Sequence, residues 1–326
     1  MHHVDTDGDD RLSTLLRELL GRRVALRHRL RGGLLTDAVG ELGNDGDGAL
    51  VVHTRRGPVP VAWDDVVAVR KIPPPTPRRA SWAAVARLEQ LCADAWPAPV
   101  DRPLGAWRLR AAGGFTGRAN AALAVGDPGL PVPDALDAVR AFAAEHGIGP
   151  RVHAPIGSRW DRAVTEAGWV LESGHEAGAE VAVLVVDLDR LTGAAHDVEL
   201  ADRPSAQWWA LALGREPTPN ERFVLDPRGG VPTAFGTVPG IGAIRAAHVV
   251  DHLHLSRLTV RPDGRRAGVA TRLTAAAAGW GRERGARWGV LQVALHNTAA
   301  RALYEGVGAV EHHRYRYLVP PDLGHR

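Results

Sequence analysis

The chain has 326 residues, of which 45% are hydrophobic and 24% are charged, so it can bury substantial cores in two or three domains. Its formal net charge is +3 and its pI is about 9.6, a modest basicity that favours an anionic ligand about as much as a nucleic acid. The single cysteine, Cys92, excludes an internal disulfide framework, and no Cys/His cluster has zinc-like spacing, so we expect no metal.

The start of the chain and its hydropathy pattern bear on location. Met1 to Asp10 is polar and acidic, without the apolar core of a signal peptide. No stretch reaches the roughly 18 apolar residues of a membrane span. We therefore expect a cytoplasmic protein with no membrane partner.

The first region ends at a proline-rich segment, Ile72 to Arg79, which we interpret as a linker because proline blocks both helix and sheet pairing. Short β-rich runs bounded by turn residues precede it: Arg23–Leu30, Ala38–Leu42, Ala49–His53, Val59–Ala62 and Val66–Lys71. This rhythm predicts a small all-β barrel over residues 14–72. Asp45 and Asp47 suggest either a calcium loop or a hairpin turn, and the missing terminal Glu favours the turn.

The middle region, residues 80–195, begins with a predicted helix and then becomes extended. The predicted elements are a helix from Ser81 to Trp96, an extended run from Trp107 to Asn120, a helix from Asp134 to His146 and a buried strand from Glu180 to Val186. The region contains no glycine-rich phosphate turn. Arg118 and Asn120 either line an acceptor cleft or form ordinary salt bridges and turn caps, and the second interpretation is favoured.

The last region, residues 196–322, is predicted to be an α/β domain. Its predicted elements are Asp197–Leu200, Ser205–Leu213, Pro232–Gly236, Ala243–His248, Leu253–Val260, Thr271–Arg284, Trp288–Leu295, Asn297–Gly306 and Glu311–Val319, of which the second, sixth and eighth are helices. Between the fifth and sixth elements lies a glycine-punctuated turn, Arg265 to Ala270. Such a turn presents unpaired backbone N–H groups, at the positive end of a helix dipole, to a pyrophosphate.

Two motifs in this region carry a family resemblance. Arg265, Gly268 and Ala270 match the pattern Gln/Arg-x-x-Gly-x-Gly/Ala, and Asn297, Ala300 and Tyr304, which follow about thirty residues later, match Asn-x-x-Ala-x-x-x-Tyr. Residues 197–320 thereby resemble the GNAT superfamily of N-acetyltransferases. The whole chain resembles the actinobacterial type with an N-terminal SH3-like barrel, and the middle region resembles a degenerate GNAT half without a cofactor site.

The resemblance implies a mixed α/β sheet and acetyl-CoA as co-substrate. By resemblance, the cofactor contacts come from a splayed strand end, the glycine turn and the second motif: Leu258, Thr259, Val260, Arg265, Arg266, Ala267, Gly268, Val269, Ala270, Thr271 and Asn297. Asn297 and Tyr304 are seven residues apart, nearly two helical turns, which places both side chains on one helical face. Tyr304 is then the general acid for the departing thiolate, and the alternatives are an N-cap for Asn297 and a core aromatic for Tyr304.

The general base is the least determined part of the site. The family often uses a Glu on the strand before the turn, and here His254 stands eleven residues before Arg265, where several members carry that Glu. Imidazole titrates near neutral pH, so His254 is the candidate base, directly or through water. The alternatives are a surface hydrogen-bonding role for His254, an ordered water, or an acidic residue from another domain.

The function expected from these features is transfer of an acetyl group from acetyl-CoA to a primary amine of a small molecule or protein. The alternatives are a tandem acetyltransferase resembling mycothiol synthase and a non-catalytic CoA-binding sensor. The barrel is a candidate site for a protein or peptide partner. Its basic residues lack interleaved aromatics, so a nucleic-acid partner is not favoured.

Overall fold

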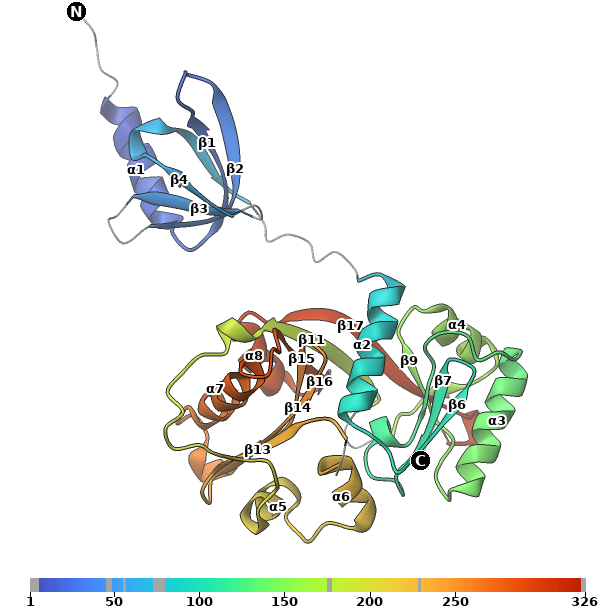
Figure 1. Cartoon of the computed structure of the whole chain (residues 1–326). Helices are drawn as coiled ribbons and strands as arrows, with labels where there is room; N and C mark the ends of the chain where they lie inside the picture. The colour runs from blue at the N-terminus through green and yellow to red at the C-terminus, as the bar shows by residue number, and fades with distance from the viewer. Residues whose placement is uncertain are drawn as a thin grey trace, which may run out of the picture. The chain divides into compact units, whose positions relative to one another are not determined.

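The computed structural model describes residues 6–44, 49–54, 57–72, 80–174, 178–227 and 230–323. The chain divides into two compact units, Met1–Arg78 and Arg79–Arg326 (Figure 1). All but the first residue of the predicted linker, and the turn containing Asp45 and Asp47, lie outside the described residues. Within the described part of the chain, no helix is long and apolar enough to cross a membrane.

The first unit is a small antiparallel sheet preceded by a helix. Its elements are α1 (Thr6–Glu18), β1 (Arg23–Arg29), β2 (Leu35–Asn44), β3 (Leu50–Thr54), β4 (Gly57–Val61) and β5 (Val66–Lys71). The strand order is β4-β3-β2-β1-β5, and alternate strand residues such as Val24 and Leu26 form a core with no solvent exposure. The five predicted strands are confirmed. Helix α1 was not predicted because its first turn is polar, although Leu16 and Leu19 pack against the core.

The second unit is built on one mixed sheet with helices on both faces. Its strands are β6 (Val100–Leu104), β7 (Trp107–Ala111), β8 (Ala122–Leu123), β9 (Val152–Pro155), β10 (Val170–Leu171), β11 (Glu180–Asp187), β12 (Glu199–Ala201), β13 (Thr233–Val238), β14 (Gly242–Val249), β15 (His252–Val260), β16 (Trp288–Ala294) and β17 (Val310–Val319). Its helices are α2 (Trp82–Ala95), α3 (Val132–Glu145), α4 (Arg159–Glu166), α5 (Ala206–Leu213), α6 (Pro219–Leu225), α7 (Val269–Arg282) and α8 (Thr298–Gly306). Helices α4 and α6 were not predicted, although the Thr218–Glu221 capping box marks the start of α6. The other helices of this unit and the strands of the last region lie close to their predicted positions.

The two halves of this sheet exchange strands. The order β12-β13-β14-β15-β16-β11-β17-β9-β8-β7-β6 places β11, from the first half, between β16 and β17 of the second half, antiparallel to both. In return, the end of β17 pairs with β9 and β10 of the first half. The halves are thus joined by main-chain hydrogen bonds across the middle of one sheet, and the boundary near residue 196 remains a prediction.

The helices give the two faces of the second half different characters. On one face, α7 packs over β14 and β15 through Leu273 and Ala277, and Tyr304 of α8 belongs to the same core. The opposite face is covered by α2, α5 and α6, with Trp96, Trp208 and buried polar side chains between the helices and the strands. The face covered by α7 is therefore an apolar core. The face covered by α2, α5 and α6, called the polar face below, places buried polar side chains beside the sheet.

Candidate active site

The parallel pairing of β15 with β16 stops inside the sheet. The pairs run from His252/Trp288 to His254/Val290, whereas β15 continues to Val260 and β16 to Ala294. Over this continuation β15 pairs only with β14 on its other side. The two strands therefore separate into a wedge, and one edge of β15 is left to face the gap. The predicted contacts Leu258, Thr259 and Val260 lie on this separated segment, and their role in binding remains a prediction.

A bulge distorts β15 where the wedge opens. The register with β14 shifts between Ala243 and Arg245, and Arg257 opposite has a φ of 53°. This left-handed region is uncommon for a residue other than glycine. Such strained backbone persists where the surrounding structure enforces it, often in functional sites. The bulge changes the direction of the main chain at the point where the wedge begins.

The glycine turn between β15 and α7 exposes backbone donors. Gly268, with a φ of 72°, is the N-cap residue of α7, and no side chain caps the helix there. Within the described residues, the backbone N–H groups from 266 to 271 make no hydrogen bond to another main-chain group. The side chains of Arg265 and Arg266 are exposed beside them. Free donors, a helix dipole and two cations together form a site suited to a phosphate group.

Arg272 supports this turn and was not predicted from the sequence. Its Nη1 donates to the carbonyl oxygen of Ala267 at 2.7 Å, and its Nε donates to both carboxylate oxygens of Asp197 at 3.0 and 3.1 Å. These bonds hold the carbonyl oxygen of Ala267 toward the side chain of Arg272 on α7. The neighbouring N–H groups of the turn are left without a main-chain partner. An arginine one turn into a helix carries no local signal of this role, because Asp197 is 75 residues away in sequence.

The second motif lies on α8, whose side chains meet α7. Tyr304 is 4% exposed, and burial raises the pKa of its phenol even though Thr274 forms a hydrogen bond with it. It lines a pocket of about 20 Å³ with Thr271 and Thr274 of α7. Asn297 is the N-cap of α8, and its Oδ1 accepts a 3.1 Å hydrogen bond from the N–H of Ala300. The capping role is thereby found for Asn297, and its cofactor contact remains a prediction.

His254 lies on the polar face at the last residue before the wedge. It is 3% exposed, and its Nε2 is 3.3 Å from Oε1 of Gln292, which also accepts a 2.9 Å hydrogen bond from Nη1 of Arg118. Because an amide oxygen only accepts, the proton is assigned to Nε2, and Nδ1 presents a lone pair. Burial, together with the charges of Arg118 and Arg245, lowers the pKa of His254 well below its usual value. The imidazole is thus neutral at pH 7.

Comparison with known proteins identifies the family. A family model described as probable histone acetyltransferase Rv0428c C-terminal matches residues 83–318, and a model described as Rv0428c N-terminal Sm-like domain matches residues 19–70. The chain belongs to the Rv0428c family. The probable histone acetyltransferase Rv0428c of Mycobacterium tuberculosis is 32% identical over an alignment of 320 residues that covers 94% of this chain and 97% of that protein.

A solved structure supports the same fold for the second unit. The GCN5-related N-acetyltransferase from Kribbella flavida has a TM-score of 0.53 and 18% identity, and covers 72% of this chain and 95% of its own. This Rv0428c-family protein is therefore an acyl-CoA-dependent N-acetyltransferase of the GNAT type, as the motifs predicted. The Sm-like description makes the predicted small barrel of the first unit more specific.

The loop before β8 holds the two middle-region residues for which two roles were considered. Asn120 accepts hydrogen bonds from the N–H groups of Ala112 and Gly114, at 2.8 and 2.9 Å, and donates to the carbonyls of Phe115 and Thr116, both at 2.8 Å. It therefore organises this loop, which is the structural role favoured from the sequence.

Arg118, from the same loop, reaches the site itself. It bonds Gln292, and its guanidinium carbon lies 4.3 Å from the centre of the Trp96 ring. In this Rv0428c-family protein, the middle region thus contributes a cation to the polar face beside His254.

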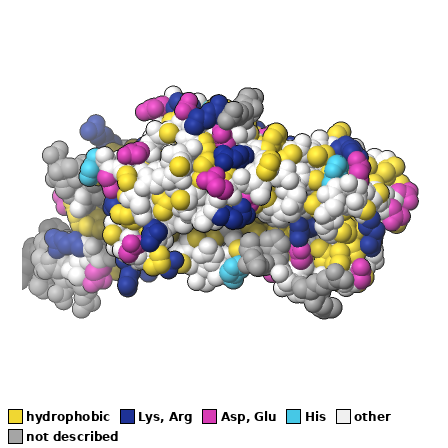
Figure 2. Space-filling model, turned by 90° about the horizontal axis from the view of Figure 1, so that it is seen from below, with side chains coloured by type: hydrophobic (Ala, Val, Ile, Leu, Met, Phe, Trp, Pro, Cys, Tyr) yellow, Lys and Arg dark blue, Asp and Glu magenta, His cyan; other side chains and the backbone are white. Residues whose placement is uncertain are grey.

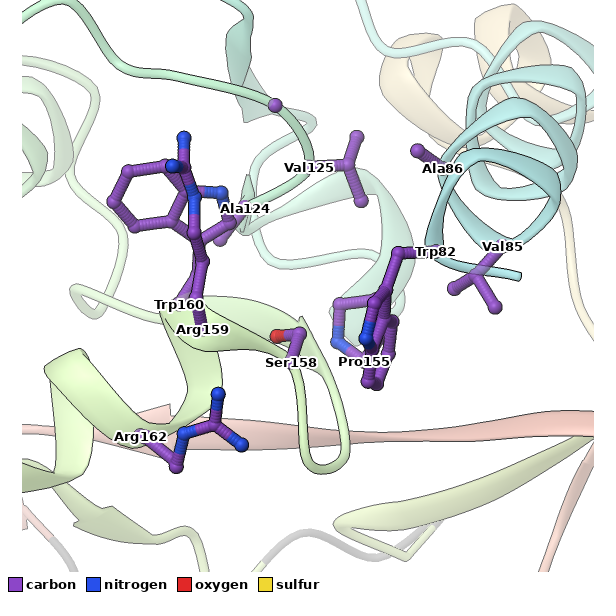
Figure 3. Close-up of a pocket in the computed structure, with 11 residues that line it drawn as sticks. Trp82, Val85, Ala86, Ala124, Val125, Pro155, Ser158, Arg159, Trp160 and Arg162 are labelled. Carbon is purple, nitrogen blue, oxygen red and sulfur yellow. The ribbon is translucent and has the colours of Figure 1, made fainter. Parts of the chain in front are cut away.

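A second pocket occupies the corresponding position in the first half. It measures about 380 Å³ and lies between α2, the end of β8 and the start of α4 (Figure 3). Strands β8 and β9 are parallel neighbours, as β15 and β16 are. The helix after β8, α3, however, has Pro131 as its N-cap residue and Pro133 in its first turn, and proline has no N–H to donate. The start of α3 therefore offers fewer backbone donors than the turn before α7, and whether the middle region has a cofactor site is not tested by this difference.

Proposed function

We propose that the protein transfers the acetyl group of acetyl-CoA to a primary amine by direct attack on the thioester. The observation that carries this proposal is the end of pairing between β15 and β16 at His254/Val290. Main-chain N–H groups on the unpaired edge of β15 would hold the pantetheine arm and stabilise the oxyanion that forms as the amine attacks. The backbone donors from 266 to 271 that have no main-chain partner would bind the pyrophosphate.

The side chains support proton transfer at both ends of the reaction. The neutral His254 would take a proton from the substrate ammonium at Nδ1, directly or through a water. The amine nitrogen then bonds the acetyl carbon and releases its second proton to solvent, the carbon–sulfur bond breaks, and Tyr304 would protonate the departing thiolate. Burial raises the pKa of Tyr304, so it carries its proton at neutral pH. Asn297, at the start of the same helix, would contact the pantetheine arm.

The acceptor, the location and the role of the barrel are less constrained. The relative is named a probable histone acetyltransferase, and a protein amine is therefore one acceptor class for this chain. On the face shown in Figure 2, Lys and Arg side chains alternate with Asp and Glu, which gives no support to a nucleic-acid surface. We place the enzyme in the cytoplasm, with the Sm-like barrel as the candidate site for a protein or peptide partner. A non-catalytic CoA sensor is the competing function.

Titration of the purified protein with acetyl-CoA by calorimetry tests the proposal. Gly268→Glu places a side chain and a negative charge at the turn, and we expect it to abolish micromolar binding. Gly285→Glu is the matched control, because Gly285 also has a positive φ and is exposed near the other end of α7. Absence of binding by the folded parent, or equal loss in both variants, would exclude the proposed cofactor site. Release of CoA from acetyl-CoA in the presence of an amine would then distinguish an enzyme from a non-catalytic CoA sensor.

A further inference from the structure

Buried polar atoms without partners gather on the polar face beside the wedge. Within the described residues, Nη1 and Nη2 of Arg245, Oγ of Ser256, Nδ1 of His254 and Nε of Arg257 have no hydrogen-bond partner. Arg245 and Ser256 are opposite each other on β14 and β15, and His254 is two residues before Ser256, so these side chains share one face. Most of these atoms are donors, and a buried donor without a partner is costly.

The same place carries positive charge that no described carboxylate neutralises in an ion pair. Arg245 is 0% exposed, and its one side-chain hydrogen bond to the described residues goes from Nε to the carbonyl oxygen of Leu225 at 2.7 Å. Arg118 and Arg257 are half-buried, and among the described residues none of these three arginines forms an ion pair. We call Arg118, Arg245 and Arg257 the arginine cluster. Burial and the charge of Arg118 lower the pKa of Arg245 to about 9, so it remains a cation at neutral pH.

Aromatic rings hold the cluster in place. The guanidinium carbons of Arg118 and Arg245 lie 4.3 and 5.2 Å from the centre of the Trp96 ring, and that of Arg257 lies 6.0 Å from the ring of Phe115. Trp96 is fully buried, so the positions of these cations are fixed by packing. A rigid set of cations with free N–H donors is complementary to a carboxylate or phosphate, which only accepts hydrogen bonds.

We propose that the arginine cluster binds an anionic group of the acceptor, so that the substrate is a primary amine that also carries a carboxylate or a phosphate. This inference rests on the proposed function and names its substrate class. It disfavours the lysine side chains of a basic peptide, because uncompensated cations beside the base repel a second cation. The bound anion would also offset the charges of Arg118 and Arg245 that disfavour protonation of His254, so binding of the correct acceptor would strengthen the base.

Matched acceptor pairs test the substrate class by release of CoA. β-Alanine is compared with β-alaninamide, O-phosphoethanolamine with ethanolamine, and the amino acids that have a primary amine with their amides, alongside a basic lysine peptide. We expect kcat/KM to be about 10- to 100-fold higher for the anionic member of the preferred pair. Preference for a carboxylate or for a phosphate identifies the anion. Equal or better turnover of the neutral amines or the basic peptide overturns the proposal and leaves the acetyltransferase intact.

Direct binding keeps the proposal testable if the panel lacks the true substrate. The anionic amines are titrated by calorimetry into the protein saturated with CoA, and into the protein alone if acetyl-CoA does not bind. Binding of an anionic amine, with none of its neutral partner, supports the cluster as an anion site. Failure of every anionic amine to bind or react overturns it. Failure of acetyl-CoA to bind concerns the proposed function alone.

Variants connect the selectivity to the cluster. Because Arg245 is fully buried, substitutions are made at the half-buried Arg118 and Arg257 instead. The two variants are Arg118→Gln and Arg257→Gln. We expect each to raise KM for the anionic acceptor about tenfold more than KM for its neutral partner. Acetyl-CoA affinity should be unchanged. Arg140→Gln, at an exposed position on α3, is the control. Unchanged preference in both cluster variants, or equal weakening of acetyl-CoA binding, contradicts the assignment.

Discussion

Arg272 donates a 2.7 Å hydrogen bond to the carbonyl oxygen of Ala267, and this bond joins the first turns of α7 to the glycine turn before it. We expect Arg272→Met to release the carbonyl and weaken acetyl-CoA binding about tenfold, the value of a typical charged hydrogen bond. Calorimetry measures the dissociation constant. Arg284→Met is the control, because Arg284 is exposed near the other end of the helix. An unchanged constant for Arg272→Met would mean that the turn keeps its shape without this bond.

Tyr304 should affect the chemical step and not the binding of the cofactor. Tyr304→Phe removes only the hydroxyl, so we expect kcat to fall about 100-fold, within the usual range for a general acid, while acetyl-CoA affinity stays the same. Because burial raises the pKa of Tyr304, the parent should lose no activity through this group between pH 7 and 9. Tyr317→Phe also removes a buried phenol hydroxyl and serves as control. Comparable loss in both variants would indicate a packing effect.

The acid limb of the pH profile should report His254. Burial and the neighbouring cations lower its pKa, so it remains able to accept a proton below pH 6.5, the usual pKa of a histidine. We expect kcat/KM for the preferred acceptor to decline only below that pH. His254→Asn should lower kcat about 100-fold and remove the limb. Steady-state rates from pH 5 to 8 measure both. A limb above pH 6.5, or full activity in His254→Asn, points to another base.

Acid stability should depend on a buried carboxylate on α2. Oε1 of Glu89 accepts a 2.7 Å hydrogen bond from Nε2 of His313, and Oε2 lies 3.2 Å from Nε2 of His153. Burial alone raises the pKa of Glu89, but the two histidines outweigh it and hold the pKa below its usual range. Burial lowers the pKa of His153. Both groups therefore bind fewer protons in the folded state, and their contribution to stability is present at neutral pH and lost on acidification.

Replacing Glu89 tests this dependence. We expect Glu89→Gln to lower the free energy of unfolding by about 3 kcal/mol at pH 7, as for other broken buried pairs, and to flatten the acid dependence. Urea unfolding followed by tryptophan fluorescence reports on the second unit, because every tryptophan except Trp63 lies there. Glu145→Gln, which removes an exposed partner of Arg102, should leave the stability nearly unchanged. Equal changes in the free energy of unfolding for Glu89→Gln and Glu145→Gln would mean that the buried carboxylate stabilises the fold no more than an exposed one does.

Local chemistry made part of this site predictable. A glycine before a helical pattern predicts a left-handed residue and free N–H groups, and Gly268 has both. Asn297 was recognised both as a helix cap and as part of the family motif, because both features occupy a few consecutive residues. Helix and strand periodicity likewise located the elements of the last region, from which the two motifs acquire their geometry.

Long-range contacts could not be obtained in this way. Glu89 and His313 are 224 residues apart in sequence, and nothing near either residue indicates the other. Arg245 was also missed, because a single arginine in a β-rich run gives no sign that it will be buried and unpaired. The partner choice of β11 is equally nonlocal, since an apolar strand fits several places in a sheet. Contacts between charged side chains that only the tertiary fold brings together cannot be found from local sequence patterns.

The exchange of β11 and β17 has a consequence for synthesis on the ribosome. The place between β9 and β10 is filled by residues near 318, which are translated well after both of these strands, so the first half emerges with an unpaired edge that it cannot complete itself. The nascent chain must keep this edge from aggregating until the C-terminal strand arrives. A premature stop after residue 309 would thus leave both halves unfinished, and a chaperone that covers exposed strands would matter more for this protein than for an acetyltransferase with a self-contained sheet.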